Sequence, residues 1–280
     1  MIGFNQLGSY GRLGNQMFQH ASLAGIAANC RLDYCIPPVQ HQTDNYGLLD
    51  AFLMSDVDLA FVDAHQREEA HYHFDEDLFH NCADNTDIKG YLQTERYFSH
   101  ISDFIRKQYT FKAQWADYSH KVMERFAKQD VIFLHIRRGD ANLVSNTGFK
   151  WAYVNLQDHH PLQTINYYQA ALEHFPSDWP VMVFSDSIEW AQEQDLFQQE
   201  RFLFVEPTVK YSDGAFVPYI DLCLMSLCQH AIIANSSLSW WGAWLQTNPD
   251  KKIITPLNWF GPALAGTDTS DLYCHNWIRI

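Results

Sequence analysis

The sequence predicts an α/β fold in which helices cover parallel β-sheets, and three observations support this. From Asp130 onward, short apolar runs alternate with helical stretches. The N-terminus has the pattern strand, glycine-rich turn and helix, which is one unit of a nucleotide-binding type of fold. An apolar run at residues 131–136 ends abruptly in two arginines, a glycine and an aspartate. Ligands of open α/β sheets bind beyond such carboxyl ends of strands.

The expected elements follow in chain order. Residues 2–7 predict a strand, residues 8–16 a glycine-rich turn and residues 17–29 an alanine-rich helix. Residues 37–129 are polar and weakly periodic, with helical patterns only at 95–107 and 117–127. In the remainder we expect strands at 131–136, 181–185, 202–205, 231–234 and 252–255, and helices at 161–175, 188–199, 219–230 and 239–245. The 280 residues suffice for two domains of ordinary size.

Composition restricts the class of partner. A formal net charge of −14 argues against a nucleic-acid partner, although it permits one small anionic ligand held by local arginines. No run approaches the roughly 18 apolar residues that an integral membrane span needs, and the N-terminus has no signal-peptide pattern. The six cysteines form no CxxC pair, which favours reduced thiols in the cytosol.

Arg137 and Arg138, directly after the strand at 131–136, are the first candidates for a ligand site. A guanidinium has a planar fork that can grip a phosphate with two hydrogen bonds. Taken alone, such a pair is more typical of surface charges. Two further segments of phosphate-binding type favour a site instead.

The first of these segments is the glycine-rich turn. Gly8, Gly11 and Gly14 have the spacing GxxGxxG, which differs from the GxGxxG of dinucleotide sites. The turn can still bring backbone N–H groups near an anion, with Asn15 and Gln16 at the start of the helix. A plain tight turn is the alternative.

The second segment is residues 231–244, AIIANSSLSWWGAW, in which a strand leads into Asn235, Ser236 and Ser237 before a helix. Hydroxyls and free N–H groups at a helix N-terminus form a phosphate site, and serine capping alone explains only one or two of these residues. The tryptophans of this segment are expected in the core.

Ser185 and Asp186 end another predicted strand and could receive a ribose or a base edge. Alternatively, Asp186 or Ser187 caps the helix that follows.

Three acidic features are set aside. The His- and Asp-rich residues 71–80 and the pair Asp56 and Asp58 imitate metal sites, but a solvated acidic surface explains both better, so we predict no metal ligands. Asp221 is interpreted as a structural anchor.

Four motifs together resemble the α-1,2-fucosyltransferases of glycosyltransferase family 11. They are residues 11–19 (GRLGNQMFQ), 135–140 (HIRRGD), 184–187 (FSDS) and 235–244 (NSSLSWWGAW). Their order and spacing match from about residue 2 to residue 277, and residues 91–93 and 224–226 fit as well. The resemblance implies a GT-B fold, with two Rossmann-like domains facing a cleft. Residues 1–128 would form the acceptor-side domain and residues 129–280 the GDP-fucose-binding domain.

The resemblance also implies roles for individual residues. Arg137 would hold the β-phosphate of the donor, with Arg138 and Asp140 shaping its surroundings and His135 supporting the strand end. The nucleoside would contact Ser185 and Asp186, the phosphates Asn235, Ser236 and Ser237, and the cleft would be lined from the N-terminal side by Gly14, Asn15 and Gln16. Catalysis would rest on Arg137, Asn15 and Asp140. The general base stays open between Asp140 and Asp158, with His135 less suited, unless Asn15 alone hydrogen-bonds the nucleophile.

The implied reaction is an inverting, metal-independent transfer of L-fucose from GDP-fucose, with no further cofactor. The acceptor would be the 2-hydroxyl of a terminal β-galactose on an oligosaccharide or glycolipid. The alternatives are another acceptor hydroxyl or sugar, and a catalytically silent protein that binds GDP-sugars or glycans. We expect a cytoplasmic location, or a peripheral one on the inner face of the membrane.

Overall fold

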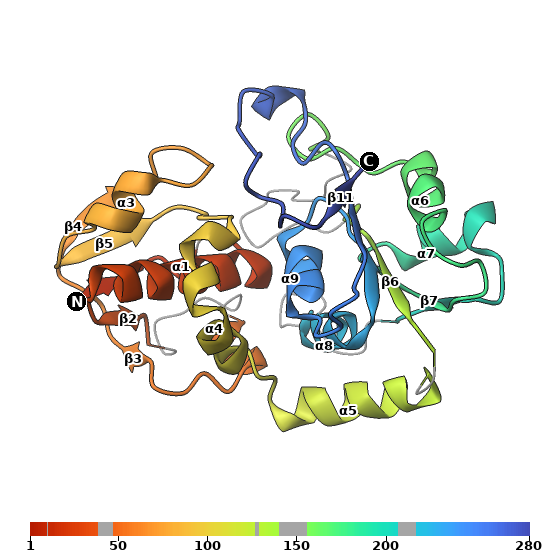
Figure 1. The fold of residues 1–280 in the computed structure, drawn as a ribbon, viewed down its shortest axis with the longest axis horizontal. Helices are drawn as coiled ribbons and strands as arrows, with labels where there is room; N and C mark the ends of the chain where they lie inside the picture. The colour runs from red at the N-terminus through yellow and green to blue at the C-terminus, as the bar shows by residue number, and fades with distance from the viewer. Residues whose placement is uncertain (10, 39–46, 127–128, 140–155, 207–216) are drawn as a thin grey trace. The chain divides into compact units, whose positions relative to one another are not determined.

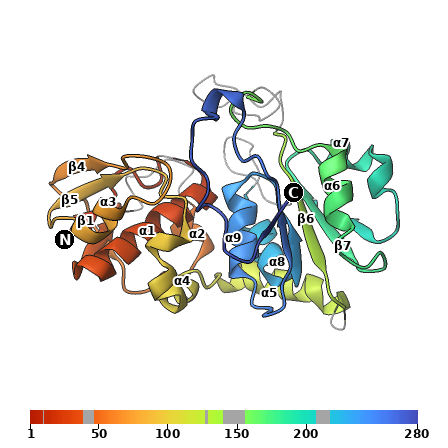
Figure 2. The same ribbon diagram turned by 45° about the horizontal axis from the view of Figure 1, so that its top comes forward.

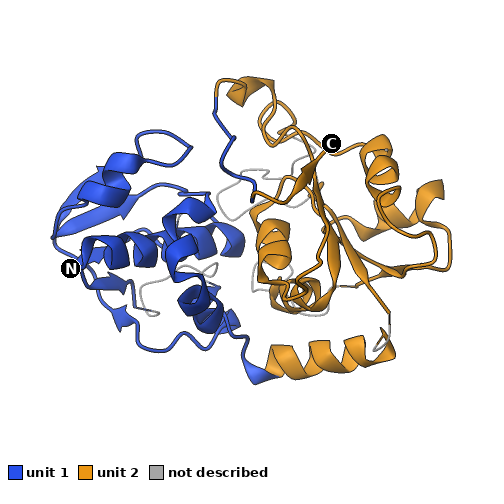
Figure 3. Ribbon diagram, viewed as in Figure 1, with its two compact units in different colours: residues 1–113, 267–274 blue, residues 114–266, 275–280 orange. Residues whose placement is uncertain are grey.

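The computed structural model describes residues 1–9, 11–38, 47–126, 129–139, 156–206 and 217–280 (Figure 1). It divides into two compact units (Figure 3). Unit 1 contains residues 1–113 and 267–274, and unit 2 contains residues 114–266 and 275–280. Each unit is a parallel β-sheet with helices, which confirms the predicted α/β class.

Unit 1 contains a five-stranded parallel sheet in the order β3-β2-β1-β5-β4. The strands are β1 (Ile2–Gly3), β2 (Tyr34–Ile36), β3 (Asp58–Leu59), β4 (His65–Glu68) and β5 (Thr86–Lys89). The helices are α1 (Leu13–Cys30), α2 (Leu48–Ala51), α3 (Glu76–Asn81) and α4 (Ser102–Gln108), with 3₁₀ turns at Glu95–Tyr97 and Ser99–Ile101. The first strand, β1, is shorter than the predicted strand at 2–7. Helix α1 begins four residues before the predicted helix at 17–29.

The prediction missed strands β2 to β5. Both residues of β3 and three of the four in β4 are exposed, so these edge strands have no alternation of apolar and polar residues to detect. The predicted helix at 95–107 corresponds to the two 3₁₀ turns and α4.

Unit 2 contains a six-stranded parallel sheet in the order β11-β10-β9-β6-β7-β8. The strands are β6 (Ile132–Ile136), β7 (Val181–Ser185), β8 (Phe202–Phe204), β9 (His230–Ile232), β10 (Ile253–Thr255) and β11 (Ile278–Arg279). The helices are α5 (Ala113–Met123), α6 (Ile165–Leu172), α7 (Ile188–Gln192), α8 (Tyr219–Leu227) and α9 (Ser237–Leu245). The five strands predicted after residue 130 are confirmed, and only β11 was not expected.

Helices cover both faces of this second sheet, with α8 and α9 on one face and α6 and α7 on the other (Figure 2). Every residue of β6 and β7 is buried. Trp240 and Trp241 are fully buried and Trp244 is 5% exposed, so the prediction that these tryptophans belong to the core is confirmed. No helix in the described residues is both long enough and apolar enough to span a membrane.

The compact units meet at residue 113, and residues 267–274 return to unit 1; the acceptor-side and GDP-fucose-binding roles given to residues 1–128 and 129–280 stay predictions. Trp115 of α5 packs edge-on against Tyr219 of α8, with ring centroids 5.2 Å apart, so this helix belongs to unit 2. The segment 267–274 belongs to unit 1, because the Asp271 carboxylate accepts the Phe74 N–H at 2.7 Å. The Thr94 hydroxyl also donates to the Asp271 carbonyl at 2.7 Å.

Each sheet has one topological switch point, where the chain stops adding strands on one side of the sheet and continues on the other side. In unit 2 the chain passes from β6 to β7 and β8 on one side, and then crosses to β9 on the other. In unit 1 the corresponding point lies between β1 and β5. Open α/β sheets bind ligands outside the carboxyl ends of the strands at such switch points. These two edges are therefore where functional side chains are expected.

Candidate active site

Three predicted segments meet at the carboxyl edge of the unit 2 sheet. Arg137 directly follows β6, Ser185 ends β7, and Asn235 to Ser237 follow β9. Strand β6 pairs in parallel with both β7 and β9, so the three segments lie at neighbouring strand ends. The structure thus brings together side chains that are separated by up to 100 residues in the sequence.

Asp186 organises the turn that contains the arginines. Its carboxylate forms a hydrogen-bonded ion pair with Arg137 and accepts the Arg138 N–H at 2.9 Å. Burial alone would raise the pKa of Asp186, but Arg137 and the backbone N–H groups of Arg138 and Gly139 hold this pKa below its ordinary value. Asp186 is therefore ionised at neutral pH and fixes the Arg137 guanidinium at the end of β6.

The capping alternative for this segment is wrong. Ser187 precedes α7, but its side chain forms no capping hydrogen bond. The Ser185 hydroxyl instead accepts the Ser187 N–H at 2.9 Å. The nucleoside contacts predicted for Ser185 and Asp186 stay predictions.

Arg138 and His135 are held by their surroundings. The Arg138 guanidinium lies over the Trp190 ring, with Cζ 3.9 Å from the centroid, which is a cation–π contact. His135 is 4% exposed, and burial lowers its pKa to about 4. Its imidazole is consequently neutral at physiological pH, and the described residues offer no hydrogen-bond partner to its Nδ1.

At the start of α9, Asn235 has a structural role, whereas among the described residues the hydroxyls of Ser236 and Ser237 have no assigned partner in the helix cap. Asn235 Nδ2 donates to the carbonyls of Pro161 and Trp259 at 3.1 and 3.0 Å, so this fully buried side chain holds the loop. Ser236 is the N-cap residue of α9, yet its side chain forms no capping bond. The first N–H groups of a helix are a common anion site, and the phosphate contacts predicted for Asn235, Ser236 and Ser237 stay predictions.

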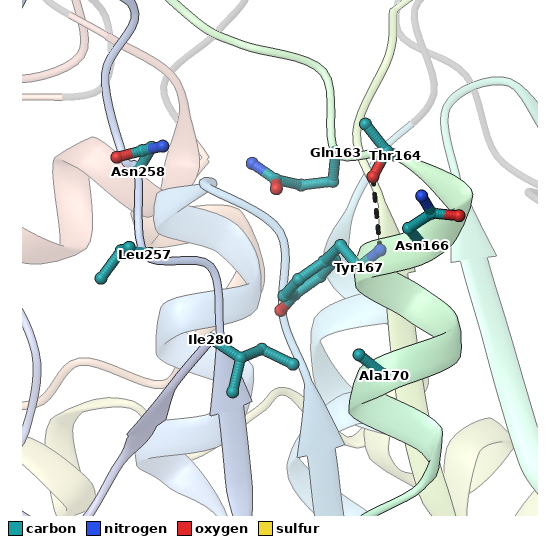
Figure 4. Close-up of a pocket in the computed structure, with 8 residues that line it drawn as sticks. All are labelled: Gln163, Thr164, Asn166, Tyr167, Ala170, Leu257, Asn258 and Ile280. Atoms are coloured by element: carbon teal, nitrogen blue, oxygen red, sulfur yellow. Dashed lines mark hydrogen bonds between the residues drawn. The ribbon is translucent and has the colours of Figure 1, made fainter.

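A pocket of about 320 Å³ lies next to this loop (Figure 4). Its polar wall consists of Gln163, Thr164, Asn166 and Asn258. Gln163 Nε2 also donates to Asn235 Oδ1 at 3.1 Å. This side chain therefore connects the pocket wall to the loop that precedes α9.

The predicted residues of unit 1 lie at the start of α1. Gln16 is fully buried and binds backbone at both ends of its amide, donating to Gly11 O at 3.0 Å and accepting the Gly47 N–H at 2.9 Å. Gly14 is buried in the first turn of the helix. The Asn15 Oδ1 accepts a hydrogen bond from Gln93 Nε2 at 2.8 Å. Ligand contacts of these residues stay predictions.

The prediction gave Gln93 no role, although it belongs to a tripeptide that matched the family pattern. Gln93 follows β5, and Asn15 follows β1, so their hydrogen bond crosses the switch point of the unit 1 sheet. The Tyr72 hydroxyl donates to Gln93 Oε1. A contact between residues 78 positions apart has no signature in a single sequence.

Of the two carboxylates considered as general bases, only Asp158 belongs to the described residues. Asp140, and most of the polar loop between residues 139 and 160, lie outside the described residues. Asp158 is exposed, and its carbonyl accepts the Ala263 N–H at 2.8 Å. Its role as a base stays a prediction.

Asp221, interpreted from the sequence as a structural anchor, lies in the first turn of α8. Helix α8 leads into the start of β9, so its first turn lies at the carboxyl edge of the sheet. Burial raises the pKa of Asp221 to about 7, and within the described residues its side chain has neither a hydrogen bond nor an ion pair. A carboxyl group with a shifted pKa at a site edge is a functional candidate.

Asp56 and Asp58 are exposed, as expected of a solvated surface. The described ranges contain no cluster of three or more His, Cys, Asp or Glu side chains arranged to hold a metal ion. Metal independence stays a prediction.

Comparison with known proteins gives the family. Glycosyl transferase family 11 matches residues 1–280. The chain is 27% identical to an alpha-1,2-colitosyltransferase of Escherichia coli, over 96% of each chain. It is 35% identical to the O-antigen biosynthesis glycosyltransferase WbnK of Escherichia coli, over 52% of this chain and 43% of that protein. It is 26% identical to galactoside alpha-(1,2)-fucosyltransferase 1 of Sus scrofa, over 84% of this chain and 63% of that enzyme.

Two solved structures share the fold. Fucosyltransferase NodZ from Bradyrhizobium has a TM-score of 0.51 at 13% identity, over 86% of this chain and 91% of that chain. POFUT1 in complex with GDP-fucose has a TM-score of 0.54 at 11% identity, over 90% of this chain and 96% of that chain. The predicted GT-B fold class is confirmed by this likeness and by the two parallel-sheet units.

Proposed function

The chain belongs to glycosyl transferase family 11 and is a glycosyltransferase, and we propose that it transfers L-fucose from GDP-fucose to the 2-hydroxyl of a terminal β-galactoside. One observation carries this proposal. The Arg137 guanidinium, fixed by Asp186, and the uncapped start of α9 share the switch-point edge of unit 2. Fixed positive charge beside free helix N–H groups suits a diphosphate.

The proposed reaction is a single displacement. The acceptor oxygen forms a bond to the anomeric carbon of fucose as the bond from that carbon to the β-phosphate oxygen breaks, and the acceptor hydroxyl loses its proton. Negative charge grows on the departing GDP. In this proposal Arg137, held in place by Asp186, and the N–H groups at the start of α9 stabilise that charge without reorganising.

A GDP-sugar with colitose in place of fucose is a second candidate donor. The relative that aligns over 96% of both chains is an alpha-1,2-colitosyltransferase. Colitose is fucose without the hydroxyl at carbon 3. A site that hydrogen-bonds this hydroxyl rejects the deoxy sugar strongly, whereas an apolar site accepts both.

The test supplies the purified protein with GDP-fucose or GDP-colitose and lactose as a soluble β-galactoside. We expect release of GDP only when acceptor is present, an α1→2 linkage by NMR, and an unchanged rate in EDTA. A product with another linkage would overturn the proposed acceptor position. Stabilisation by GDP without any GDP release from either sugar would identify a silent binding protein.

A further inference from the structure

We propose that Gln93, itself held by Tyr72, is a positioning residue that presents the Asn15 side chain as a hydrogen-bond donor to an oxygen of the bound substrates. The inference rests on the proposed function and adds residues to it. Its physical basis is the direction of a short hydrogen-bond chain at the carboxyl edge of unit 1.

An amide has one donor end and one acceptor end, so occupying one end determines what the other end can do. Gln93 Nε2 donates to Asn15 Oδ1 at 2.8 Å, and the Tyr72 hydroxyl donates to Gln93 Oε1. With Oδ1 occupied, Asn15 offers Nδ2, which has no acceptor among the described residues. Asn15 is thereby a donor, and it cannot take the proton of the acceptor hydroxyl.

Gly11 and the burial of Gln93 both fit this role. Gly11 has a φ of +92°, and a Cβ placed there would lie 2.7 Å from Asn15 Nδ2. Glycine at this position therefore keeps the donor end uncovered. Gln93 is 7% exposed, so water does not compete freely for its amide.

The chain leading to Gln93 is held in an unusual conformation. Leu92 is fully buried and has a φ of +50°, a left-handed value that is strained for a residue with a Cβ. The Glu69 carboxylate accepts the N–H groups of Tyr91 and Leu92 at 2.9 and 3.1 Å, which holds that conformation. Backbone strain of this kind is concentrated at functional sites.

The decisive variant is Gln93→Glu. A carboxylate is nearly the same size but only accepts, so it keeps bonds to Tyr72 and Asn15 while forcing Nδ2 inward and Oδ1 outward. We expect kcat to fall by about 10²-fold, as for loss of one transition-state donor, while the Kd for GDP stays within about twofold. Gln93→Met should lower kcat less, because Asn15 can then adopt either orientation.

A double-mutant cycle separates positioning from structure. In an Asn15→Ala background, Gln93→Glu should have almost no further effect on kcat, because the side chain it acts through is gone. An equal fold-loss in both backgrounds would overturn the inference. Gln108→Glu is the matched control, since Gln108 is a buried amide of unit 1 that donates to Ser55 O at 2.9 Å. It should lower Tm without changing kcat per folded molecule.

A second readout does not depend on transfer activity. The side-chain amide NMR signals of Asn15 should show exchanging Nδ2 protons in the wild type, and protected, shifted ones in Gln93→Glu. An unchanged Asn15 signal would refute the positioning role. If the wild type transferred from neither GDP-sugar, the proposed function would fail, and these signals would still decide how Asn15 is oriented.

Discussion

The two switch-point edges share a topology but differ in electrostatics. In unit 2 the first strand leads to Arg137, which is paired with the ionised Asp186. In unit 1 the first strand leads to Asn15, which is joined to Gln93 by a bond between neutral amides. A fixed charge suits the stabilisation of a departing diphosphate. The chain of amides instead orients the Asn15 side chain as a hydrogen-bond donor and adds no charge. Under the proposed function, the same arrangement of strand and loop would provide a charged group at one edge and a neutral hydrogen-bond donor at the other.

Removing the Arg137 guanidinium from unit 2 should have the largest effect on kcat. Arg137→Ala should lower kcat by about 10²–10³-fold, or about 3–4 kcal/mol, and weaken GDP binding. Arg137→Lys should fail as well, because an ammonium group cannot replace the planar fork. Steady-state kinetics and calorimetric titration with GDP measure both effects, with Arg201→Lys as a control in the same unit. Near-normal turnover by the Lys variant would contradict the two-bond contact.

Covering the Asn15 Nδ2 group in unit 1 should have an intermediate effect on kcat. Gly11→Ala adds a Cβ against Asn15 in a left-handed backbone, so we expect about 1 kcal/mol of lost stability and roughly a tenfold fall in kcat. The Kd for GDP should not change. Gly266→Ala is the control, because no atom lies within 4 Å of a Cβ at Gly266. Equal kinetics for both alanine variants would count against a functional Asn15.

The two edges should also respond differently to pH. Burial raises the pKa of Glu69 to about 7 despite its hydrogen bonds to the N–H groups of Tyr91 and Leu92, whereas the pKa of Asp186 is lowered. For Glu69 the folded state binds the proton more tightly, so this contribution to stability is present below about pH 4.5 and is lost as pH rises toward 7. Asp186 acts in the opposite sense and loses its contribution as pH falls through its folded pKa.

We therefore expect Glu69→Gln to gain stability relative to the wild type between pH 5 and pH 8. The difference in Tm should widen by a few degrees, at about 2–4 °C per kcal/mol. Thermal melts over that pH range measure it. A difference in Tm that stays constant with pH would show that Glu69 does not titrate there.

The smallest effect should come from the pocket wall of unit 2. Gln163→Ala removes one neutral hydrogen bond to Asn235, which is worth about 1 kcal/mol. GDP affinity should fall by about twofold, because the loop before α9 becomes less ordered. Asn166→Ala changes the same pocket without touching Asn235 and should leave GDP affinity unaltered in the same titration.

The sequence predicted unit 2 far better than unit 1, and the reason is physical. Strands β6 and β7 are buried along their whole length, so each is a continuous apolar run. Strand β4 reads HQRE and is mostly exposed, so only its hydrogen bonds to β5 define it. Short edge strands carry no such hydrophobic signal.

The same contrast applies to the site. Arg137 and the serines before α9 could be found because each directly follows an apolar strand. Capping geometry was needed to separate Ser236, whose side chain forms no capping bond, from Asn235, which holds the loop. Gln93 could be assigned a function only from its hydrogen bond to Asn15, since nothing local in its sequence distinguishes it from a structural amide.

The return of residues 267–274 to unit 1 has a practical consequence for domain shuffling. A chimera that exchanges only residues 1–113 with a relative would leave Asp271 from one parent facing Phe74 and Thr94 from the other. Hybrids that replace unit 1 should therefore exchange residues 267–274 together with residues 1–113.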